Sequence, residues 1–318
     1  MQTAISLILL LSGLVILFKS ADILVSGSVA LARAFNIPAL IVGLTIVAMG
    51  TSAPELAASI AATLRESGNI AMGNVYGSNI ANLALVGGAS AIISPILVSK
   101  RVLRYELPVM TAAALLLLPF IADLHLSRIE GFLFLGIFII LIILTISRAA
   151  RDAALARELT PPPPVEKTLP TPRCMIYILA GLIGLAVGAD ITVRGAVRIG
   201  TVIGLSEAVI GMTIIAIGTS LPELFTCVVA AVKGHDEISI GNLVGSNIFN
   251  TLLVTGTAAV TQPFSLQASL AGADYWIMIG VCGIFIAMAA VQKKISRFCG
   301  VILLILYLSF LVFQVRGG

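Results

Sequence analysis

An internal repeat constrains the fold of this chain more than any other feature of its sequence. Residues 43–87 align without a gap on residues 211–255, at a constant offset of 168, with 21 identical residues among 45. Both copies contain the pattern GTS-x-PE, followed by GN-x-x-GSNI-x-N. A repeat of this kind indicates two copies of one structural unit, so we expect the two halves of the chain to share a fold.

The chain is hydrophobic enough to be an integral membrane protein embedded in a lipid bilayer. Hydrophobic residues make up 59% of its 318 residues and charged residues 11%, and the mean hydropathy is +1.11. Apolar runs of about 20 residues can cross a bilayer as helices. The first run has no basic residue before it, so we expect a span there and not a removable signal peptide. We predict ten spans, near residues 3–31, 38–64, 70–97, 106–122, 129–148, 175–203, 207–232, 238–260, 272–291 and 297–315.

A proline-rich segment separates two halves with five predicted spans each. Residues 150–173 contain six prolines and mixed charges, which predicts an extended linker between a first repeat, 1–149, and a second, 174–318. Because five is odd, the second repeat must enter the membrane in the opposite orientation. The predicted fold is therefore an all-α integral membrane protein of two inverted five-helix repeats, an arrangement typical of secondary transporters.

The distribution of positive charge predicts the orientation of the chain. If the N-terminus lies outside, the inner loops hold 13 of the 19 lysine and arginine residues. Cytoplasmic loops carry such an excess, so we expect both termini outside and the linker inside. The basic residues are spread over several loops and form no patch, which gives no support for nucleic-acid binding. Nothing in the sequence indicates an obligate protein partner.

The GTS-x-PE motif interrupts an apolar span in each repeat. Pro54 and Pro222 each remove a backbone donor and clash with the preceding turn, which predicts a kinked or broken helix. Carbonyl groups before the break lose their helical partners, and such backbone is tolerated within a membrane only inside protein or beside a polar cavity. Glu55 and Glu223 follow the breaks directly. Inversion of the repeats should bring the two carboxylates together at the centre of the molecule.

These groups suit a hard cation. Ca²⁺ takes about six to eight oxygen ligands, and a cation removes the repulsion between two facing glutamates. The second motif adds oxygen atoms, because Ser78 and Asn82 lie four residues apart on one helix face, as do Ser246 and Asn250. The alternative is a structural carboxylate for each glutamate, and interhelical hydrogen bonding for the serines and asparagines. Glycines at positions 73, 77, 241 and 245 predict close approach of this helix to the broken one.

The paired motifs resemble the alpha-repeats of the cation/calcium exchanger superfamily, sodium/calcium exchanger type, and the layout resembles its compact ten-helix prokaryotic members. The resemblance implies a secondary active antiporter of the prokaryotic plasma membrane that exchanges Na⁺ for Ca²⁺ by alternating access, as the first and sixth helices slide across the others. It implies no cofactor besides the transported ions. In the implied site Glu55 and Glu223 are the central ligands of Ca²⁺ and also serve Na⁺, and the backbone carbonyls of Thr51 and Thr219 complete the calcium site. The side chains of Ser52, Ser78, Ser220 and Ser246 and the backbone carbonyls of Ala48 and Ala216 line the sodium sites. Asn82 and Asn250 lie at the border of the site.

Two features depart from patterns in that superfamily. Some relatives have an aspartate at the position of Asn250, whereas both copies here have asparagine. The formal charge of the site is then that of two glutamates, and cotransport of K⁺ is not expected. The linker is also too short for the large regulatory calcium-binding domain of animal exchangers, so we expect no regulation of that kind.

Two other transport functions are compatible with the same residues. A Ca²⁺/H⁺ antiporter would neutralise the glutamates with protons, but protons would not need the hydroxyl groups on both sides, which favour Na⁺. A passive cation channel would also need oxygen-lined sites, but an inverted repeat around one acidic site favours alternating access. An enzyme is not expected, because the sequence has no HExxH motif and no histidine within a span to activate a serine.

The other polar residues are expected to be structural. Asp22 and Asp190 occupy equivalent positions in the repeats, and we expect them near the membrane surface or paired with Lys19 and Arg194. The cysteines have no paired spacing and should serve packing, not a disulfide or a zinc site. We also expect solvated loop positions for His125 and His235, and interfacial positions for Tyr275 and Trp276.

Overall fold

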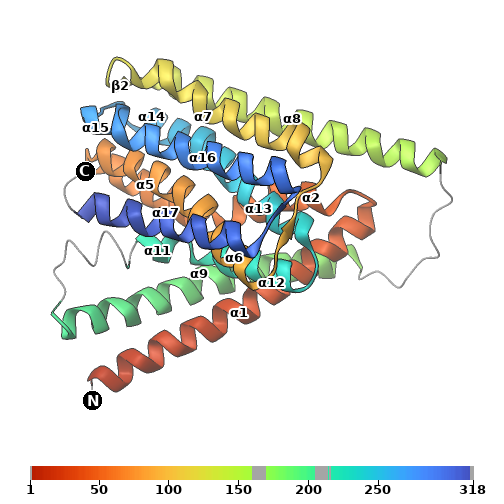
Figure 1. Cartoon of the computed structure of the whole chain (residues 1–318), viewed down its shortest axis with the longest axis horizontal. Helices are drawn as coiled ribbons and strands as arrows, with labels where there is room; N and C mark the ends of the chain where they lie inside the picture. Colours follow the sequence, from red (N-terminus) through yellow and green to blue (C-terminus); the bar gives the residue numbers. More distant parts are fainter. Residues whose placement is uncertain (1, 160–169, 205–213, 215, 316–318) are drawn as a thin grey trace.

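The computed structural model describes residues 2–159, 170–204, 214 and 216–315, and these form a bundle of helices (Figure 1). Several helices contain π-helical segments, here labelled η. The first half contains α1 (Gln2–Phe35), α2 (Ala39–Val42), η1 (Gly43–Val47), α3 (Ala48–Thr51), α4 (Ala53–Leu64), α5 (Gly68–Ile80), η2 (Ala81–Val86), α6 (Gly87–Ile93), η3 (Val102–Glu106), α7 (Leu107–Ile121) and α8 (Arg128–Leu159). The second half contains α9 (Thr171–Val202), α11 (Ala216–Thr219), α12 (Leu221–Val232), α13 (Asp236–Phe249), η5 (Asn250–Val254), α14 (Thr255–Thr261), α15 (Ala268–Ala271), α16 (Ala273–Gln292) and α17 (Arg297–Val315).

Seven helices of the described part are long and apolar enough to cross a membrane. The helical segments Ala39–Thr51 and Ala53–Leu64 are bent by 42° at Ser52, and they count as an eighth span if they cross the membrane together. The helix Leu221–Val232 is apolar but shorter, and part of the predicted span 207–232 lies outside the described residues. The count of ten spans therefore stays a prediction.

The long helices α1 and α9 run antiparallel and lie side by side along the lower edge of Figure 1. A Cβ atom added at Gly27 would lie 3.1 Å from the backbone nitrogen of Ile178, and one added at Gly195 would lie 2.6 Å from that of Leu10. These two contacts are equivalent under the offset of 168, so a pseudo-two-fold axis relates the two helices. Glycine at both positions permits this close approach, because any side chain would collide with the facing backbone.

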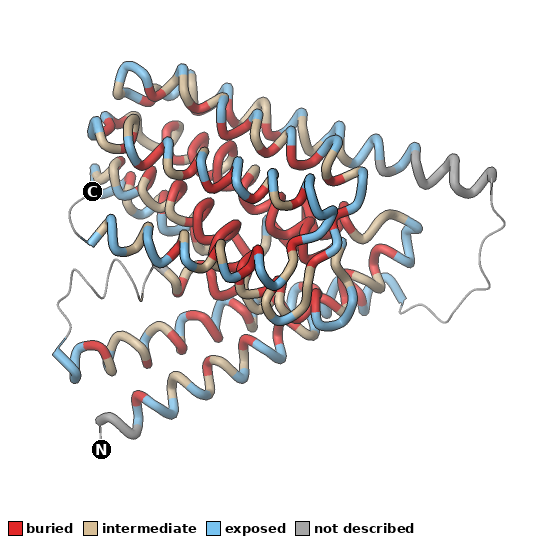
Figure 2. Tube along the Cα trace, viewed as in Figure 1, coloured by how far each residue is buried: buried red, intermediate tan, exposed pale blue. Residues whose placement is uncertain are grey.

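Two groups of buried apolar residues hold the bundle together. One lies between α1, α9 and α12, and includes Leu17, Leu24, Ile178 and Val229. The other fills the space between the remaining helices, where buried residues are concentrated in the centre of Figure 2. The outward faces carry many exposed aliphatic side chains, as expected where lipid replaces water as the solvent.

Two short strand pairs repeat the internal symmetry. Strand β1 (Ile96–Leu97) pairs antiparallel with β4 (Lys294–Ile295), and β2 (His125–Leu126) pairs antiparallel with β3 (Phe264–Ser265). Strands β1 and β3 are equivalent under the offset of 168. Each pair ties a loop of one half to a loop of the other, so the two halves form one unit.

The expectation of an extended linker over residues 150–173 is wrong at both of its ends. Helix α8 continues to Leu159 and α9 begins at Thr171. The sequence ARDAALAREL favours helix because it is rich in alanine and leucine, and the run of prolines at 161–164 cannot continue it. The middle of the linker lies outside the described residues.

Three of the structural expectations need correction. Asp22 forms an ion pair with Lys233 and not with Lys19. Tyr275 is completely buried and donates a hydrogen bond of 3.1 Å to the carbonyl of Ala114, whereas Trp276 is exposed as expected. His235 is half-buried at the start of α13, and this burial, followed by the charges of Arg33 and Lys233, lowers its pKa.

The other structural expectations agree with the structure. Asp190 pairs with Arg194 at 2.8 Å. His125 is exposed as expected. It lies in β2, where it pairs with Ser265 of β3, and not in an open loop. All four cysteines are buried and none forms a disulfide: Cys174, Cys227, Cys282 and Cys299.

Candidate cation site

The first GTS-x-PE motif breaks its helix at Ser52. This residue has φ −85° and ψ 7°, between α3 and α4, and Pro54 lies in the first turn of α4, where its missing donor costs nothing. Glu55 lies in the same turn and is 1% exposed. The positive end of the helix dipole favours a carboxylate at this position. The predicted break is therefore present, and it orients a buried glutamate.

The second motif repeats this geometry. Ser220 has φ −88° and ψ 4°, between α11 and α12, Pro222 lies in the first turn of α12, and Glu223 follows it with no exposed surface. The backbone angles at the two serines agree within a few degrees. Two unrelated helix breaks would not be expected to match so closely, so the repeats fold alike at this point.

The structure brings the two breaks together. The hydroxyl of Ser52 donates a hydrogen bond of 2.9 Å to Oε1 of Glu223, which joins the first break to the carboxylate of the second. Glu55 is buried at the first break and Glu223 at the second. Two buried carboxylates are costly without a compensating positive charge.

The same region contains many buried polar atoms that have no hydrogen-bond partner. Buried polar groups are nearly always bonded, so a cluster of unpartnered oxygen atoms indicates a place where a ligand supplies the missing contacts. Unpartnered atoms at predicted site residues are both carboxylate oxygens of Glu55, Oε2 of Glu223, the hydroxyls of Ser220 and Ser246, and the side-chain amides of Asn82 and Asn250.

The two asparagines lie at the start of π-helical segments. Asn82 is the second residue of η2 and Asn250 is the first residue of η5, and both are completely buried. A π-helical turn widens the helix and is frequent at functional sites. The apolar sequences around these asparagines contain no proline or other break, so nothing in the sequence marks the widened turns.

The remaining predicted residues lie in the same elements. Ser78 on α5 and Ser246 on α13 are buried, as are Thr51 and Ala48 of α3. Thr219 is half-buried at the end of α11, and Ala216 begins that helix. The structure thus brings most of the predicted set to the two helix breaks and the helices beside them, and for Ala216 only the backbone is described.

Two further asparagines, absent from the predicted site, support it. Asn242 accepts a hydrogen bond of 3.1 Å from the Thr51 hydroxyl and donates one of 3.3 Å to Sγ of Cys227. Its equivalent, Asn74, donates to the Glu55 carbonyl at 3.0 Å and to Ser59 Oγ at 2.9 Å. Both residues lie in the GN-x-x-GSNI-x-N motif, and their recurrence at equivalent positions was the signal that could have identified them.

The chemistry of the donor set is that of a hard-cation site. Its side chains offer carboxylate, hydroxyl and amide oxygens, which suit Na⁺, Ca²⁺ and similar ions. Within the described residues, no cluster of three or more His, Cys, Asp and Glu side chains could hold a metal ion. The two glutamates therefore need neutral oxygen atoms to complete a coordination shell.

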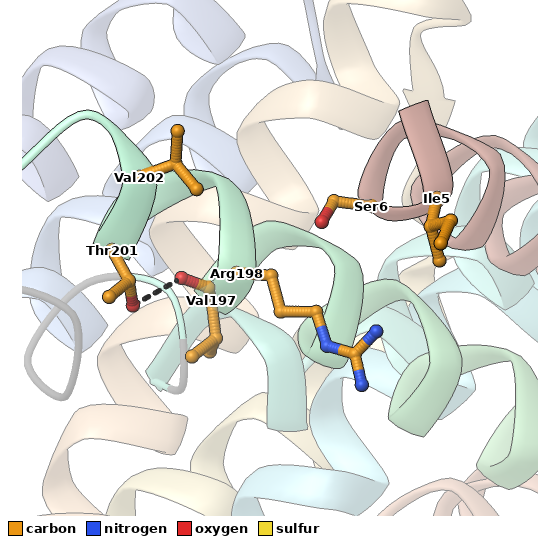
Figure 3. A pocket seen from close by; sticks show the side chains of 6 residues that line it. All are labelled: Ile5, Ser6, Val197, Arg198, Thr201 and Val202. Carbon is orange, nitrogen blue, oxygen red and sulfur yellow. Dashed lines mark hydrogen bonds between the residues drawn. The ribbon is translucent and has the colours of Figure 1, made fainter. Parts of the chain in front are cut away.

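A separate cavity of about 440 Å³ lies between the beginning of α1 and the end of α9 (Figure 3). None of the residues that line it is acidic, and its one charged residue, Arg198, is cationic. A second cavity of about 120 Å³ lies beside η1 and η3, near Arg101, Glu106 and Arg148. Neither cavity includes the two helix-break glutamates, so neither is the candidate cation site.

Comparison with known proteins gives consistent matches over nearly the whole chain. A family model described as sodium/calcium exchanger protein matches residues 5–147 and 174–316. The putative antiporter CaxA of Alkalimonas amylolytica is 39% identical over 96% of this chain and 97% of its own length. The sodium/calcium exchanger MaX1 of Methanosarcina acetivorans is 30% identical over 97% of this chain and 98% of its own. A structure of the sodium-calcium exchanger NCX_Mj, soaked with Na⁺ and Sr²⁺, is 31% identical, covers 96% of this chain and 97% of its own, and superimposes with a TM-score of 0.81.

Proposed function

The chain belongs to the sodium/calcium exchanger family, and from this we propose that it exchanges Na⁺ for Ca²⁺ across a membrane by alternating access. The family resemblance seen in the sequence is confirmed, as is the all-α membrane fold of two repeats. A cation/Ca²⁺ antiporter is the function that family and fold support, and the choice of Na⁺ as the counter-ion is the finer part of the proposal.

One observation carries the proposal. Glu55 and Glu223 are buried at two equivalent helix breaks, and buried oxygen atoms without a hydrogen-bond partner lie at these breaks and on the helices beside them. This arrangement supports central roles for both glutamates as ligands of Ca²⁺. The proposed neighbours are the carbonyls of Thr51 and Thr219, the serines 52, 78, 220 and 246, the carbonyls of Ala48 and Ala216, and the amides of Asn82 and Asn250.

The hydroxyl groups support Na⁺ over H⁺ as the counter-ion. Ser220 and Ser246 are buried and have no hydrogen-bond partner. A proton on a glutamate needs no further ligand, whereas Na⁺ needs several oxygen atoms around it. A Ca²⁺/H⁺ antiporter, the alternative, would leave these hydroxyls without a function and at the cost of burying unbonded polar groups.

The proposed location is a prokaryotic plasma membrane with both termini outside. Bacterial and archaeal relatives support a prokaryotic membrane, and the excess of basic residues in alternate loops supports the orientation. Accessibility of a cysteine added at either terminus to an impermeant maleimide, in intact cells, tests it. Labelling only after the cells are opened would contradict the orientation.

Calcium uptake into liposomes tests the proposed function. Purified protein is reconstituted, and ⁴⁵Ca²⁺ uptake is driven in separate experiments by an outward Na⁺ gradient and by a pH gradient. We expect uptake that requires internal Na⁺. Uptake driven only by the pH gradient would contradict Na⁺ coupling and support the proton-coupled alternative.

The control variants are Glu55→Gln and Glu223→Gln. Each replaces a carboxylate by a neutral amide of nearly the same size, so the fold should be kept while the charge that balances the cation is lost. We expect uptake to fall to the level of empty liposomes in both variants. Normal uptake by either folded variant would contradict the assignment of the site.

A further inference from the structure

An ion pair joins the α1–α9 helix pair to the end of α12. Lys233, just after α12, contacts the carboxylate of Asp22 in α1 and donates a hydrogen bond of 3.2 Å to Ser26 of the same helix. The side chains of Lys233 and Asp22 are 36% and 41% exposed, so the pair lies at the edge of the bundle. It connects α1 to the residue that follows α12.

The equivalent pair in the other half is not formed. Under the offset of 168, Asp22 corresponds to Asp190 in α9, and Lys233 corresponds to Arg65 at the end of α4. Within the described part of the chain no ion pair joins Arg65 to Asp190. Asp190 instead pairs at 2.8 Å with Arg194, one turn further along its own helix, and both of these side chains are more than half exposed. The sequence thus has opposite charges at two equivalent pairs of positions, and the described structure forms an ion pair at one of them.

Helix packing follows the same asymmetry. The apolar cluster around α1 and α9 includes Val229 and Ala230 of α12. The equivalent residues of α4, Ala61 and Ala62, are not in that cluster, and Ala61 is exposed. Within the described residues the α1–α9 pair therefore packs against α12, whereas Ala61 on the equivalent face of α4 is exposed.

The hydrogen bonds of the candidate cation site also differ between the two repeats. The Ser52 hydroxyl bonds to Glu223, whereas its equivalent, Ser220, has no partner and Glu55 accepts no bond at either carboxylate oxygen. The ion pairs, the helix packing and the hydrogen bonds of the site thus distinguish the two halves.

We propose that Asp22–Lys233 and Arg65–Asp190 are alternative latches that hold the α1–α9 pair in two opposite conformations. In the conformation described here the first latch is closed and the second is open. Movement of α1 and α9 toward α4 breaks the first latch, covers the exposed face of α4, and brings Asp190 to Arg65. The inference rests on the proposed alternating access, and it assigns a role to four charged residues outside the cation site.

The exposure of these side chains sets the size of the effect. Solvent-exposed ion pairs contribute little to stability, so neither latch can trap the protein in one conformation. Each latch should bias the ratio of the two conformations by about 1.5- to 5-fold. Because the two latches have the same charges, their contributions oppose each other and keep the two conformations near balance.

Distance measurements between spin labels test the proposal. Ile70→Cys, in the first turn of α5 and five residues after Arg65, and Val187→Cys, on α9, place labels at exposed positions, while the native cysteines are buried. We expect a long and a short distance in the reconstituted protein, the short one arising when Asp190 reaches Arg65. Lys233→Met should raise the ratio of short to long distances by about 1.5- to 5-fold, and Arg65→Met should lower it by a similar factor.

A charge exchange separates a latch from a general structural role. The double variant Asp22→Lys with Lys233→Asp restores the ion pair with its charges reversed, so the distance ratio should return to that of the unsubstituted protein. A single distance under all ionic conditions, or a shift in the same direction for Lys233→Met and Arg65→Met, would overturn the proposal. Calcium uptake is measured on the same samples, so failure of Na⁺/Ca²⁺ exchange is distinguished from failure of the latches.

Discussion

The hydroxyl of Ser52 and Oε1 of Glu223 lie 2.9 Å apart in a hydrogen bond that crosses from one repeat to the other. Both side chains are completely buried, so the bond is formed without competition from water. It makes each half of the site depend on the other, because a residue of the first helix break orients the carboxylate of the second. The equivalent bond between Ser220 and Glu55 is not formed, which provides an internal control.

Substitution of the two serines should therefore have unequal effects on stability. Ser52→Ala removes a buried hydrogen bond to a carboxylate, which should lower the free energy of unfolding by about 1–3 kcal/mol. Ser220→Ala removes a hydroxyl that has no partner, and the change should stay within about 0.5 kcal/mol. Thermal unfolding of the purified variants in detergent without Ca²⁺ measures both. Equal destabilisation by the two substitutions would contradict the observed asymmetry.

Asn250→Asp should raise the affinity for Ca²⁺. The Asn250 amide is buried and both of its polar atoms lack partners, so an aspartate there would add a third carboxylate to the two glutamates. Ligand charge tunes Ca²⁺ affinity, and one more buried charge should tighten binding by about tenfold. The same substitution should lower the melting temperature in the absence of cations, because the three carboxylates repel one another.

Titration with Ca²⁺ by calorimetry, together with melting curves with and without the ion, checks both effects. The equivalent variant Asn82→Asp is a matched control, since Asn82 is the second residue of the corresponding π-helical segment and its side-chain amide also lacks partners. We expect a change in the same direction there. Unchanged Ca²⁺ affinity in both variants would show that neither asparagine lies at the cation site.

Asn242→Leu should weaken transport more than it weakens the fold. Asn242 accepts the hydrogen bond from Thr51, so leucine at this position leaves Thr51 with a longer contact, 3.4 Å, to the carbonyl of Ala48. The loss of one buried hydrogen bond should cost about 1 kcal/mol. The Michaelis constant for Ca²⁺ uptake should rise several-fold, since the proposed Thr51 carbonyl is no longer held in position.

Cys227→Ser is the matched control for Asn242→Leu. The equivalent residue in the first repeat is Ser59, which accepts a hydrogen bond of 2.9 Å from Asn74, so serine can take the place of the thiol that Asn242 contacts. We expect nearly unchanged uptake in this variant. A loss as large as that of Asn242→Leu would mean that the region tolerates no change of volume and that Asn242 has no specific role.

The sequence was sufficient for the main features of fold and site because the repeat supplies two independent copies of each signal. The prolines of GTS-x-PE predicted both helix breaks, and the structure has them at Ser52 and Ser220 with matching backbone angles. The buried glutamates follow directly from their places after the prolines. These features are local consequences of backbone chemistry, so they can be recognised without knowledge of the packing.

The features that sequence reasoning missed depend on tertiary contacts. Asn74 and Asn242 acquire their roles only from partners on other helices. The π-helical turns at Asn82 and Asn250 have no local break in the sequence to mark them. Asp22 was expected near the membrane surface or paired with Lys19 of its own helix, but it forms an ion pair with Lys233, which follows α12. Asymmetry between identical motifs also cannot be read from a repeat, because the two copies predict the same structure.

Close packing at Gly245 leads to a last prediction. A Cβ atom at Gly245 would lie 2.6 Å from the Leu44 carbonyl oxygen and 2.7 Å from Cβ of Ala48, so Gly245→Ala must displace the helix that leads to Thr51. Overpacking of this kind should lower the free energy of unfolding by about 1–3 kcal/mol. At the exposed Gly283 of α16 no described atom lies within 4 Å, and Gly283→Ala should leave stability unchanged or raise it by up to about 1 kcal/mol, because alanine favours helix. Melting temperatures of the two variants measure both effects, and an equal loss in the two variants would mean that packing against Leu44 does not determine the effect of Gly245→Ala.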